Sequence, residues 1–518
     1  MREQLPKIVI VGLMLIVVGL PFVLRAMGLA TESTTLDLPE DTKRLVIYSP
    51  HNEQIRDELS LGFNRYREAN GLPPVRLEWR TSGGTSDLRR GILSQFTAVA
   101  EREGIDEGIG ADLFFGGGEY DHGKLAEGIT VGDEKVSVAR VPNLPEGLLN
   151  EAFPQRDIGG EALVHDEELW IGTALSSFGL VYNRDLLAML EIDEPTTWEH
   201  LADPQFANWI AMADPGHSGS ISAALETVLR RQGWNEGWAT LRRIFANSRY
   251  FSASASKVPL DVARGDAAAG MAIDFYGRFQ AGATKREGQP SLVGYADPAV
   301  DGVSQTATTA DPITLLRGAP ELELAEEFIA WTLTKEAQSL WQRRIDLPDD
   351  VEAPERYELR RQPIREDMFT DAEKELWSDP ELDPFGQASP FPDAMPGFFS
   401  SVAPVSHAIA IDIHDDIKAA WKTIIATSDA DPRKAEMLAL FDAMPPELTV
   451  VWPDEQLAAT WPTVIADQDH PRYSEVEQTL ADFKASLRPV DRDELLANRL
   501  KWTAFFRNNY QAIVAMGD

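Results

Sequence analysis

The amino-acid sequence predicts an α/β protein of two lobes with an added, mainly helical C-terminal extension. In the first part of the chain, short apolar strands alternate with amphipathic helices, which is typical of a parallel sheet covered by helices. Two long extended segments, 173–187 and 306–319, bracket a second block of the same kind. They indicate a chain that crosses to a second lobe and returns, which leaves a cleft between the lobes. Residues 350–518 are instead rich in Pro, Asp and Trp.

The first lobe is predicted from three strands and the helices that follow them. We expect strands at 43–49, 74–80 and 111–118, and helices at 53–71 and 86–103. Ligands bind beyond the carboxyl ends of the strands in such a sheet. The residues at these ends are SPHNE, RTSGGTS and FGGGEY, so we expect them at the binding edge.

The second block begins where the first extended segment ends. Within it, 197–220 ends in a strand and a Gly/Ser turn, 221–233 is a helix, and 267–279 contains another strand. A helix pair is expected at 325–344, after the second extended segment. The Trp residues of positions 198–341 are expected in the core.

The C-terminal extension is predicted to be mainly helical. Helical patches lie at 409–426 and 433–443, and a final helix is expected at 493–514. We place five apolar residues on one side of that helix: Leu496, Leu500, Phe506, Tyr510 and Ile513. We expect the extension to pack on the first lobe, because its apolar helices need a partner surface.

Composition excludes several classes of function. The chain of 518 residues has 43% hydrophobic and 25% charged residues, as an ordinary globular protein does. Its net charge of -35 argues against a nucleic-acid partner, whose phosphates it would repel. There is no cysteine, which excludes disulfides, thiolate metal sites and a cysteine nucleophile.

An apolar run near the N-terminus predicts the compartment. Residues 8–24 carry no charge and would form a helix of roughly 25 Å, just short of a bilayer core. Arg2 and Lys7 precede the run and place the N-terminus on the cytoplasmic side. The run is either a cleaved signal peptide or a retained membrane anchor. In both cases the rest of the chain lies outside the cytoplasmic membrane, in the periplasm or on the extracytoplasmic face.

Seven segments occur in the order found in one family of proteins. They are LVIYSPHNE, RTSGGTSDL, ADLFFGGG, SSFGLVYNRD, PTTWEHLADPQFANWIAMADPGHSGS, RGDAAAGMAIDFYGRF and FIAWTLTKEAQSLW. Through these segments, which cover about 45–345, the chain resembles the family 1 extracellular solute-binding proteins of ABC importers. That family includes binders of ferric ion, phosphonate and phosphoglycerate.

The resemblance implies a type II periplasmic-binding-protein fold, whose two lobes close on a ligand and deliver it to an ABC permease. It implies no enzyme and no cofactor. The expected division of the chain is 1–28 transmembrane anchor or signal peptide, 29–42 polar stem, 43–176 first part of lobe 1, 177–306 lobe 2, 307–349 return to lobe 1, and 350–518 C-terminal extension.

Ligand contacts are predicted from both sides of the cleft. Backbone N–H groups and hydroxyls at helix N-termini suit an anion, and RTSGGTSDL and PGHSGS offer both. The same side chains could simply cap helices. The predicted ligand-binding residues are His51, Glu53, Ser82, Gly83, Gly84, Thr85, Gly117, Ser176, Ser177, Ser218, Gly219, Ser220, Ser256, Lys257, Asp274 and Tyr276.

Three other functions stay open at this point. A ferric-iron site could be built from Tyr276, His51, Glu53 and Asp274, although IDFYGRF has Phe275 where ferric-ion binders carry another tyrosine. A membrane-tethered sensor or adaptor could use the same fold. A serine hydrolase could use Ser218, because GHSGS nearly matches the nucleophile elbow.

Overall fold

The structure is a computed structural model, and it describes residues 38–517 except 40–41, 349, 393–394 and 489–491. The apolar run 8–24 lies outside the described residues, so the anchor or signal peptide stays a prediction. Within the described part of the chain, no helix is long and apolar enough to cross a membrane.

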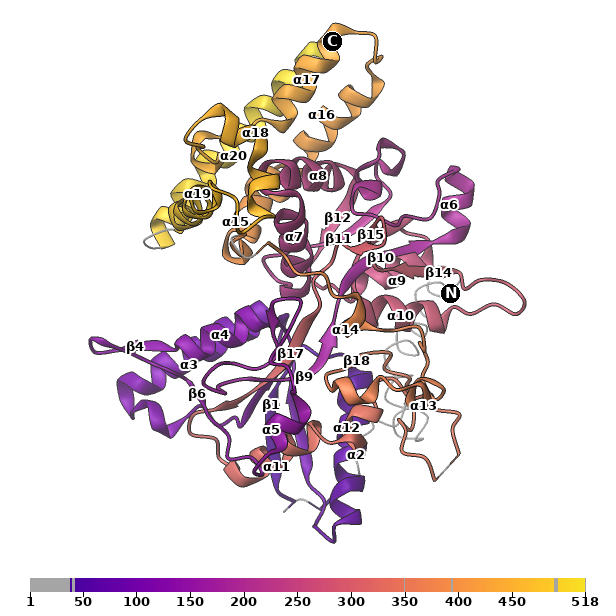
Figure 1. Ribbon diagram of the computed structural model, residues 1–518, viewed down its shortest axis with the longest axis vertical. Coiled ribbons are helices and arrows are strands. Elements are labelled where there is room, and N and C mark those ends of the chain that lie inside the picture. Colours follow the sequence, from indigo (N-terminus) through magenta and orange to yellow (C-terminus); the bar gives the residue numbers. More distant parts are fainter. Residues whose placement is uncertain (1–37, 40–41, 349, 393–394, 489–491, 518) are drawn as a thin grey trace, which may run out of the picture.

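Two sheets, each covered by helices, form the two lobes (Figure 1). The first lobe is built on a seven-stranded sheet in which β1 runs parallel to β2 and β3. Along the sheet the strands are β18 (Gln362–Pro363), β9 (Ile171–Ser176), β17 (Thr309–Leu316), β3 (Leu113–Phe115), β1 (Arg44–Tyr48) and β2 (Arg76–Arg80), with β6 (Ala139–Arg140) also paired to β17.

The helices of the first lobe follow its strands, and several begin at the sheet edge that faces the second lobe. They are α2 (Glu53–Ala69), α3 (Thr85–Arg102), α4 (Glu119–Glu127), α5 (Leu148–Ala152), α11 (Leu322–Thr332) and α12 (Lys335–Ser339). Two short hairpins are attached, β4 (Ile129–Val131) with β5 (Glu134–Val136), and β7 (Asp157–Ile158) with β8 (Glu161–Ala162).

The second lobe has a five-stranded mixed sheet. Its strands, in order across the sheet, are β12 (Ser248–Ser252), β11 (Ile210–Ala213), β13 (Ala269–Ile273), β10 (Phe178–Asn183) and β14 (Val293–Ala296). Its helices are α6 (Arg184–Leu190), α7 (Gly219–Gln232), α8 (Trp234–Asn247), α9 (Lys257–Arg264) and α10 (Asp274–Ala283), and β15 (Ala299–Val300) pairs with β16 (Val303–Ser304) in a hairpin.

The chain crosses between the lobes at two neighbouring places. β9 ends in the first sheet at Ser176, and β10 begins in the second sheet at Phe178. The return strand β17 pairs antiparallel with β9, with Thr309 opposite Ser176. The predicted α/β class with two lobes is therefore confirmed, and the crossings lie side by side because the strands that carry them are hydrogen-bonded neighbours.

The extension has two parts with different surroundings. Residues 350–368 lie on the first lobe, where the buried Glu58 carboxylate accepts backbone N–H groups of residues 355–357 and β18 pairs with β9. The first sheet thus continues beyond residue 349. Two short helices follow, α13 (Asp371–Lys374) and α14 (Pro384–Gln387).

Residues 399–517, here called the helical bundle, pack on the second lobe. Its helices are α15 (Phe399–Ile409), α16 (His414–Ala426), α17 (Pro432–Asp442), α18 (Glu455–Ile465), α19 (Tyr473–Ser486) and α20 (Arg492–Gly517). α15 lies against α7, and α16 and α17 lie against α8 (Figure 1). The expectation that the extension packs on the first lobe is wrong for the bundle, because α8 presents Trp234 and Arg242 to it.

The buried face of the final helix is predicted correctly for Phe506, Tyr510 and Ile513 but not for Leu496 and Leu500. Trp502, Phe506, Tyr510 and Ile513 are buried, whereas Leu496 and Leu500 are 55% and 62% exposed. At 3.6 residues per turn, the two leucines are rotated by roughly a quarter turn or more from Phe506.

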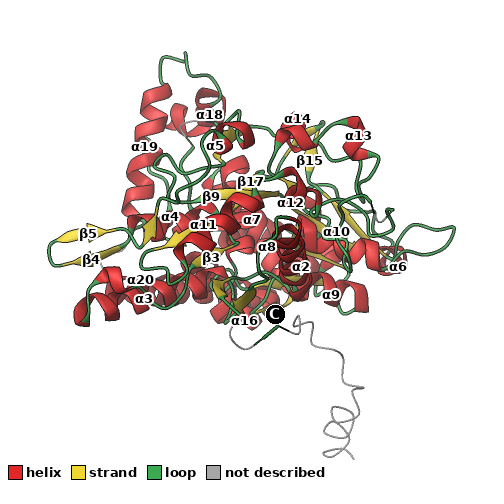
Figure 2. Ribbon diagram, turned by 90° about the horizontal axis from the view of Figure 1, so that it is seen from below, coloured by secondary structure: helices red, strands yellow, loops and turns green. Residues whose placement is uncertain are grey.

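Figure 2 shows the helices, in red, on both sides of the yellow strands.

Candidate functional site

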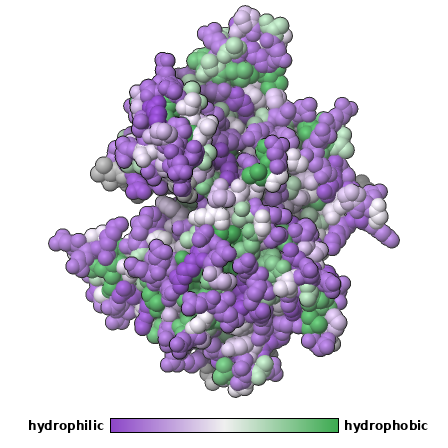
Figure 3. All heavy atoms as spheres, in the orientation of Figure 1, coloured by the Kyte–Doolittle hydropathy of each residue, from purple (hydrophilic) through white to green (hydrophobic). Residues whose placement is uncertain are grey.

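A cavity of about 1290 Å³ lies between the two lobes and the helical bundle. Figure 3 shows a mostly hydrophilic surface that is indented at the left, between the first lobe and the bundle. Eleven of the predicted ligand-binding residues line the cavity: His51, Gly83, Gly84, Thr85, Gly117, Ser176, Ser218, Gly219, Ser220, Ser256 and Tyr276. Five others do not line it: Glu53, Ser82, Ser177, Lys257 and Asp274.

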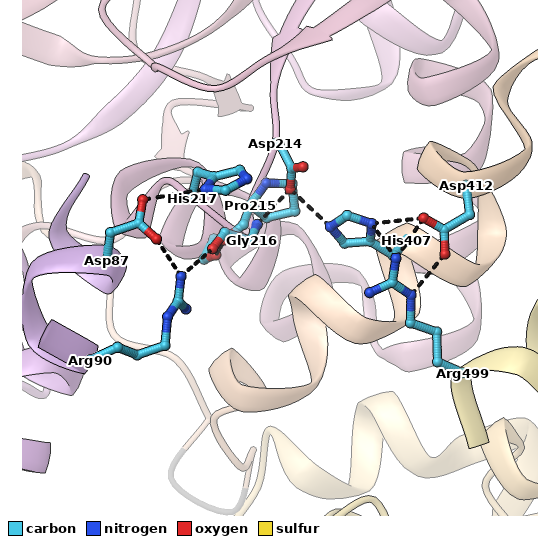
Figure 4. Close-up of polar contacts among 10 residues, drawn as sticks. Asp87, Arg90, Asp214, Pro215, Gly216, His217, His407, Asp412 and Arg499 are labelled. Carbon is cyan, nitrogen blue, oxygen red and sulfur yellow. Dashed lines mark hydrogen bonds and ion pairs between the residues drawn. The ribbon is translucent and has the colours of Figure 1, made fainter. Parts of the chain in front are cut away.

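The two predicted anion-binding turns lie directly against each other. An added Cβ on Gly84 would be 2.1 Å from the carbonyl oxygen of His217, so glycine is required for this approach. His217 Nδ1 lies 3.3 Å from an Asp87 carboxylate oxygen, and Arg90 donates to the Gly216 carbonyl at 3.3 Å (Figure 4). The first lobe therefore contacts the second lobe directly at these turns.

Helix capping accounts for the hydroxyl of Ser218, but not for the hydroxyls of the other predicted anion-binding turn, at residues 82–86. Ser218 is the N-cap of α7, because its Oγ accepts the Ile221 N–H at 3.3 Å. The N-cap of α3 is Gly84, which offers no side chain, and Ser82 is exposed beside it. Ser218 Oγ contacts Ser220 Oγ at 3.1 Å, and no described histidine side chain bonds to it, so the hydrolase arrangement is not formed.

A carboxylate of the first lobe faces the N-terminus of α7. Asp121 Oδ2 would be 3.0 Å from a Cβ added to Gly219, and no described residue forms a hydrogen bond with it. Arg89 donates to the other oxygen at 2.7 Å. Burial raises the pKa of Asp121, against the charge of Arg89. The positive end of the α7 dipole is thus already close to an acidic group when the lobes are in contact.

A buried charge cluster forms the other end of the cavity, near the crossing strands. Arg361 lies 3.0 Å from Asp311 and donates to Ser176 Oγ at 2.8 Å. His51 Nε2 lies 2.8 Å from Asp311 and 3.2 Å from Arg361. Gly117 donates its N–H to Asp311 at 2.8 Å. Residues that are far apart in the sequence, from His51 to Arg361, therefore meet at one point of the cleft.

The charges of this cluster can be counted. Burial opposes ionisation of Asp311, but the charge of Arg361 and the contact with His51 lower its pKa to about 2. Burial lowers the pKa of His51 below its usual value, which favours the neutral ring. Arg361 and Asp311 therefore compensate each other, and the cluster itself is close to neutral.

Arg56, in the first half of α2, adds a positive charge to the same cavity. Its Nε donates to the Asn52 carbonyl at 3.2 Å, and within the described ranges no carboxylate pairs with it. Burial lowers the pKa of His51 and raises that of Tyr276, and the charge of Arg56 adds to the first effect and opposes the second, so it acts on both sides of the cleft. The hinge-side end of the cavity thus has one uncompensated cation.

The residues proposed for iron are not assembled into a metal site. Glu53 is exposed on the first turn of α2, and Asp274 is buried and accepts a bond from Gln362 at 2.7 Å. Burial raises the pKa of Tyr276 to about 12, which keeps its hydroxyl protonated. Among the described residues, no group of three or more His, Asp or Glu could hold a metal ion.

Two other predicted residues have partners within their own lobe. Ser177 donates to Asp297 at 2.8 Å, and Lys257 pairs with Asp261. Burial raises the pKa of Asp274 to about 6. The contacts of Ser177 and Lys257 hold both side chains within the second lobe, and neither residue lines the cavity.

Sequence reasoning missed Arg56, Asp311 and Arg361. Arg56 looked like a surface residue of an amphipathic helix, and Arg361 lies beyond the last family-like segment. The guanidinium of Arg361 stands over the Phe275 ring at 4.4 Å. Phe275, which stands where ferric-ion binders carry a tyrosine, was the signal in the sequence that pointed to Arg361. An aromatic ring at this place can hold a cationic side chain over its face.

Comparison with known proteins agrees with this architecture. Residues 149–367 match the family described as bacterial extracellular solute-binding protein. A phosphoglycerate transport regulatory protein of Salmonella typhimurium is 32% identical over 106 residues, which is 20% of this chain and 27% of that protein. An uncharacterized protein of Haemophilus influenzae is 28% identical over 165 residues, 31% of this chain and 44% of that one. The chain thus spans about a quarter to under half of these relatives.

A solved structure extends the similarity of fold. It is a periplasmic binding protein of Actinobacillus pleuropneumoniae with bound fructose-6-phosphate, with a TM-score of 0.51 and 17% identity. The match covers 73% of this chain and 97% of that one, and it concerns the fold alone. The predicted resemblance is confirmed, and this family and fold are those of binding proteins rather than enzymes. Residues 149–367 are thus similar to bacterial extracellular solute-binding proteins, and the chain has the fold seen in a periplasmic binding protein.

Proposed function

We propose that this protein is the extracytoplasmic solute-binding component of an ABC import system and that its ligand is a small organic anion, with phosphorylated compounds as the first class to test. The lobes close on the ligand, and the closed form delivers it to the permease. The protein then works in the periplasm or at the outer face of the cytoplasmic membrane, held there or released according to the fate of residues 1–28.

The observation that carries the choice of ligand is the pair of arginines at the hinge-side end of the cavity. Arg361 is buried and compensated by Asp311, whereas Arg56 lines the cavity without a carboxylate partner in the described chain. An anion placed there gains charge-assisted hydrogen bonds, which are about twice as strong as neutral ones. A ferric ion would be repelled by the uncompensated guanidinium of Arg56.

The names of the similar proteins support the same class of ligand. One relative is named for phosphoglycerate transport, and the periplasmic binding protein of similar fold holds fructose-6-phosphate. Both ligands combine a phosphate with a hydroxylated carbon chain. The cavity volume of about 1290 Å³ leaves space for such a molecule.

Closure follows from the contacts of the ligand with both lobes. Arg56 and His51 belong to the first lobe, and Tyr276 and Phe275 belong to the second. A ligand that touches both sets binds the closed form better than the open form. This difference in affinity is what moves the equilibrium between the two forms.

The test is isothermal titration calorimetry of the purified full-length protein with phosphoglycerate, fructose 6-phosphate, inorganic phosphate and ferric citrate. We expect saturable binding of an organic phosphate, weakened about 10- to 100-fold by Arg56→Gln, because a hydrogen bond to a charged group contributes about 1.5–3 kcal/mol. Binding of ferric citrate alone, or binding unaffected by Arg56→Gln, would overturn the proposal.

The matched control is Arg102→Gln. Arg102, like Arg56, is a helical arginine of the first lobe whose Nε donates to the carbonyl four residues earlier, at 3.0 Å. It does not line the cavity. The control should bind as the unsubstituted protein does, so that a loss confined to Arg56→Gln reports on the cavity and not on helix α2 or α3 in general.

A further inference from the structure

The helical bundle is attached firmly to the second lobe. Trp234 of α8 donates its indole N–H to the Leu448 carbonyl at 2.8 Å, and Trp421 of α16 donates to Asn247 at 2.8 Å. The Arg242 guanidinium is fully buried and bonds to the carbonyls at the end of α17. These contacts are buried, so the bundle and the second lobe form one body.

The bundle also reaches the first lobe, at the wall of the cavity. The ring of Phe399, at the start of α15, stacks on Tyr120 of α4, with centroids 4.3 Å apart and an angle of 26° between planes. The Tyr120 ring is further covered by Arg89 and Lys124 of the first lobe, at 5.4 and 5.5 Å. Tyr120 and Phe399 both line the cavity. The aromatic pair therefore joins the bundle to the first lobe within the lining of the cavity.

A second link connects the bundle to the turn where the lobes meet. His407 of α15 lies 3.1 Å from Asp214, and Asp214 in turn accepts the Gly216 N–H at 2.7 Å. Arg90 of the first lobe contacts the same turn at the Gly216 carbonyl (Figure 4). The bundle thus supports, from behind, the part of the second lobe against which the first lobe closes.

We propose that the helical bundle is a third wall of the solute cavity, which moves with the second lobe and closes on the first lobe through the Phe399–Tyr120 stack. The family match ends at residue 367, so the known domain does not include this wall. The stack is formed in the closed form and is lost when the lobes separate. It therefore raises the ratio of closed to open protein and tightens ligand binding in proportion to the fraction of closed protein.

This inference rests on the proposed function in one respect, namely that the lobes open and close. Its test needs no ligand. The chain has no cysteine, so nitroxide labels can be attached at Asp133→Cys in the first-lobe hairpin and Met189→Cys on α6 of the second lobe. Both sites are exposed. Double electron–electron resonance on the full-length protein then measures the distance between the lobes.

We expect a shorter and a longer distance, and a ratio of closed to open protein that falls about two- to tenfold in Phe399→Leu, as loss of an aromatic pair predicts. Tyr120→Leu, which removes the stack from the other lobe, should give the same fall. The control Phe505→Leu alters a half-buried ring that contacts Phe506 within the bundle, and it should leave the ratio unchanged.

An unchanged ratio in both Phe399→Leu and Tyr120→Leu would overturn the inference. One invariant distance in all the proteins would also overturn it, because the bundle would then be fixed to both lobes. A parallel sample with phosphoglycerate reports separately on the proposed function. Failure of phosphoglycerate to shift the distances tests the choice of ligand and leaves the comparison of variants intact.

Discussion

Replacement of Arg361 by methionine would remove the central cation of the hinge-side cluster while keeping the length and apolar contacts of the side chain. The substitution deletes the 3.0 Å ion pair with Asp311 and the hydrogen bond to Ser176. Asp311 is 2% exposed and would stay buried. Its remaining partners would be His51 and the Gly117 N–H, both at 2.8 Å.

The expected loss of stability follows from these contacts. Removal of one partner of a buried ion pair typically destabilises a protein by about 3–5 kcal/mol, because the other charge is left uncompensated. Two hydrogen bonds to Asp311 survive, so we expect the lower end, about 3 kcal/mol at neutral pH. Urea unfolding followed by tryptophan fluorescence measures this difference in the free energy of unfolding.

The pH dependence gives an independent check. In the unsubstituted protein the pKa of Asp311 lies at about 2, below its ordinary 3.8. Its contribution to stability is therefore present above the ordinary value and lost as the pH falls towards 2. Without Arg361, burial raises this pKa, so the folded variant takes up a proton more readily than the unfolded chain. The deficit of Arg361→Met should consequently shrink in mild acid.

The double variant Arg361→Met with Asp311→Asn serves as the control. Removal of the orphaned charge should restore at least half of the lost free energy at neutral pH. An unfolding midpoint of Arg361→Met equal to that of the unsubstituted protein would refute the reasoning. A deficit that is the same in mild acid, or that the second substitution does not relieve, would show that the loss does not come from Asp311.

Two further predictions concern the helical bundle. Burial opposes protonation of His407, but its contacts with Asp214 and Asp412 outweigh this effect and that of nearby Arg499, so its pKa is raised. The protonated His407 therefore stabilises the folded protein below the ordinary pKa of 6.5, and this stabilisation is lost as the pH rises through the pKa of the folded state. Calorimetry should show a melting temperature that falls over this pH range. The fall should be absent in His407→Gln. A dependence that persists in the variant would exclude His407 as its source. Trp234→Phe removes the indole hydrogen bond to the bundle and should lower the free energy of unfolding by about 1 kcal/mol. Limited proteolysis within the bundle should become faster. Equal proteolysis rates in the variant and the unsubstituted protein would show that this contact does not hold the bundle in place.

The first half of the chain could be predicted closely because its signals are local. β1, α2, β2, α3 and β3 begin and end within a few residues of the predicted limits. Alternation of apolar residues, helical spacing and glycine after the strands depend on neighbours along the chain. The same signals located the turns at Gly84 and Ser218.

The charged residues of the site could not be predicted in this way. Arg56, Asp311 and Arg361 are far apart in the sequence, and each looks ordinary in its own segment. They acquire their roles because the return strand β17 and strand β18 place them beside the first helix of the lobe. The compensation of a buried charge depends on distance in space, which periodicity along the chain does not contain.

The sequence by itself determined the α/β class, the order of the elements of both lobes and the resemblance to a family of binding proteins. Only the tertiary structure decided that the two predicted turns meet at Gly84 and His217, and that the helical bundle covers α7 and α8. It also decided that Arg56 lines the cavity without a carboxylate partner among the described residues. The physical reason is that apolar periodicity fixes which face of an element is buried, whereas the partner of that face is chosen by shape and charge among surfaces formed after folding.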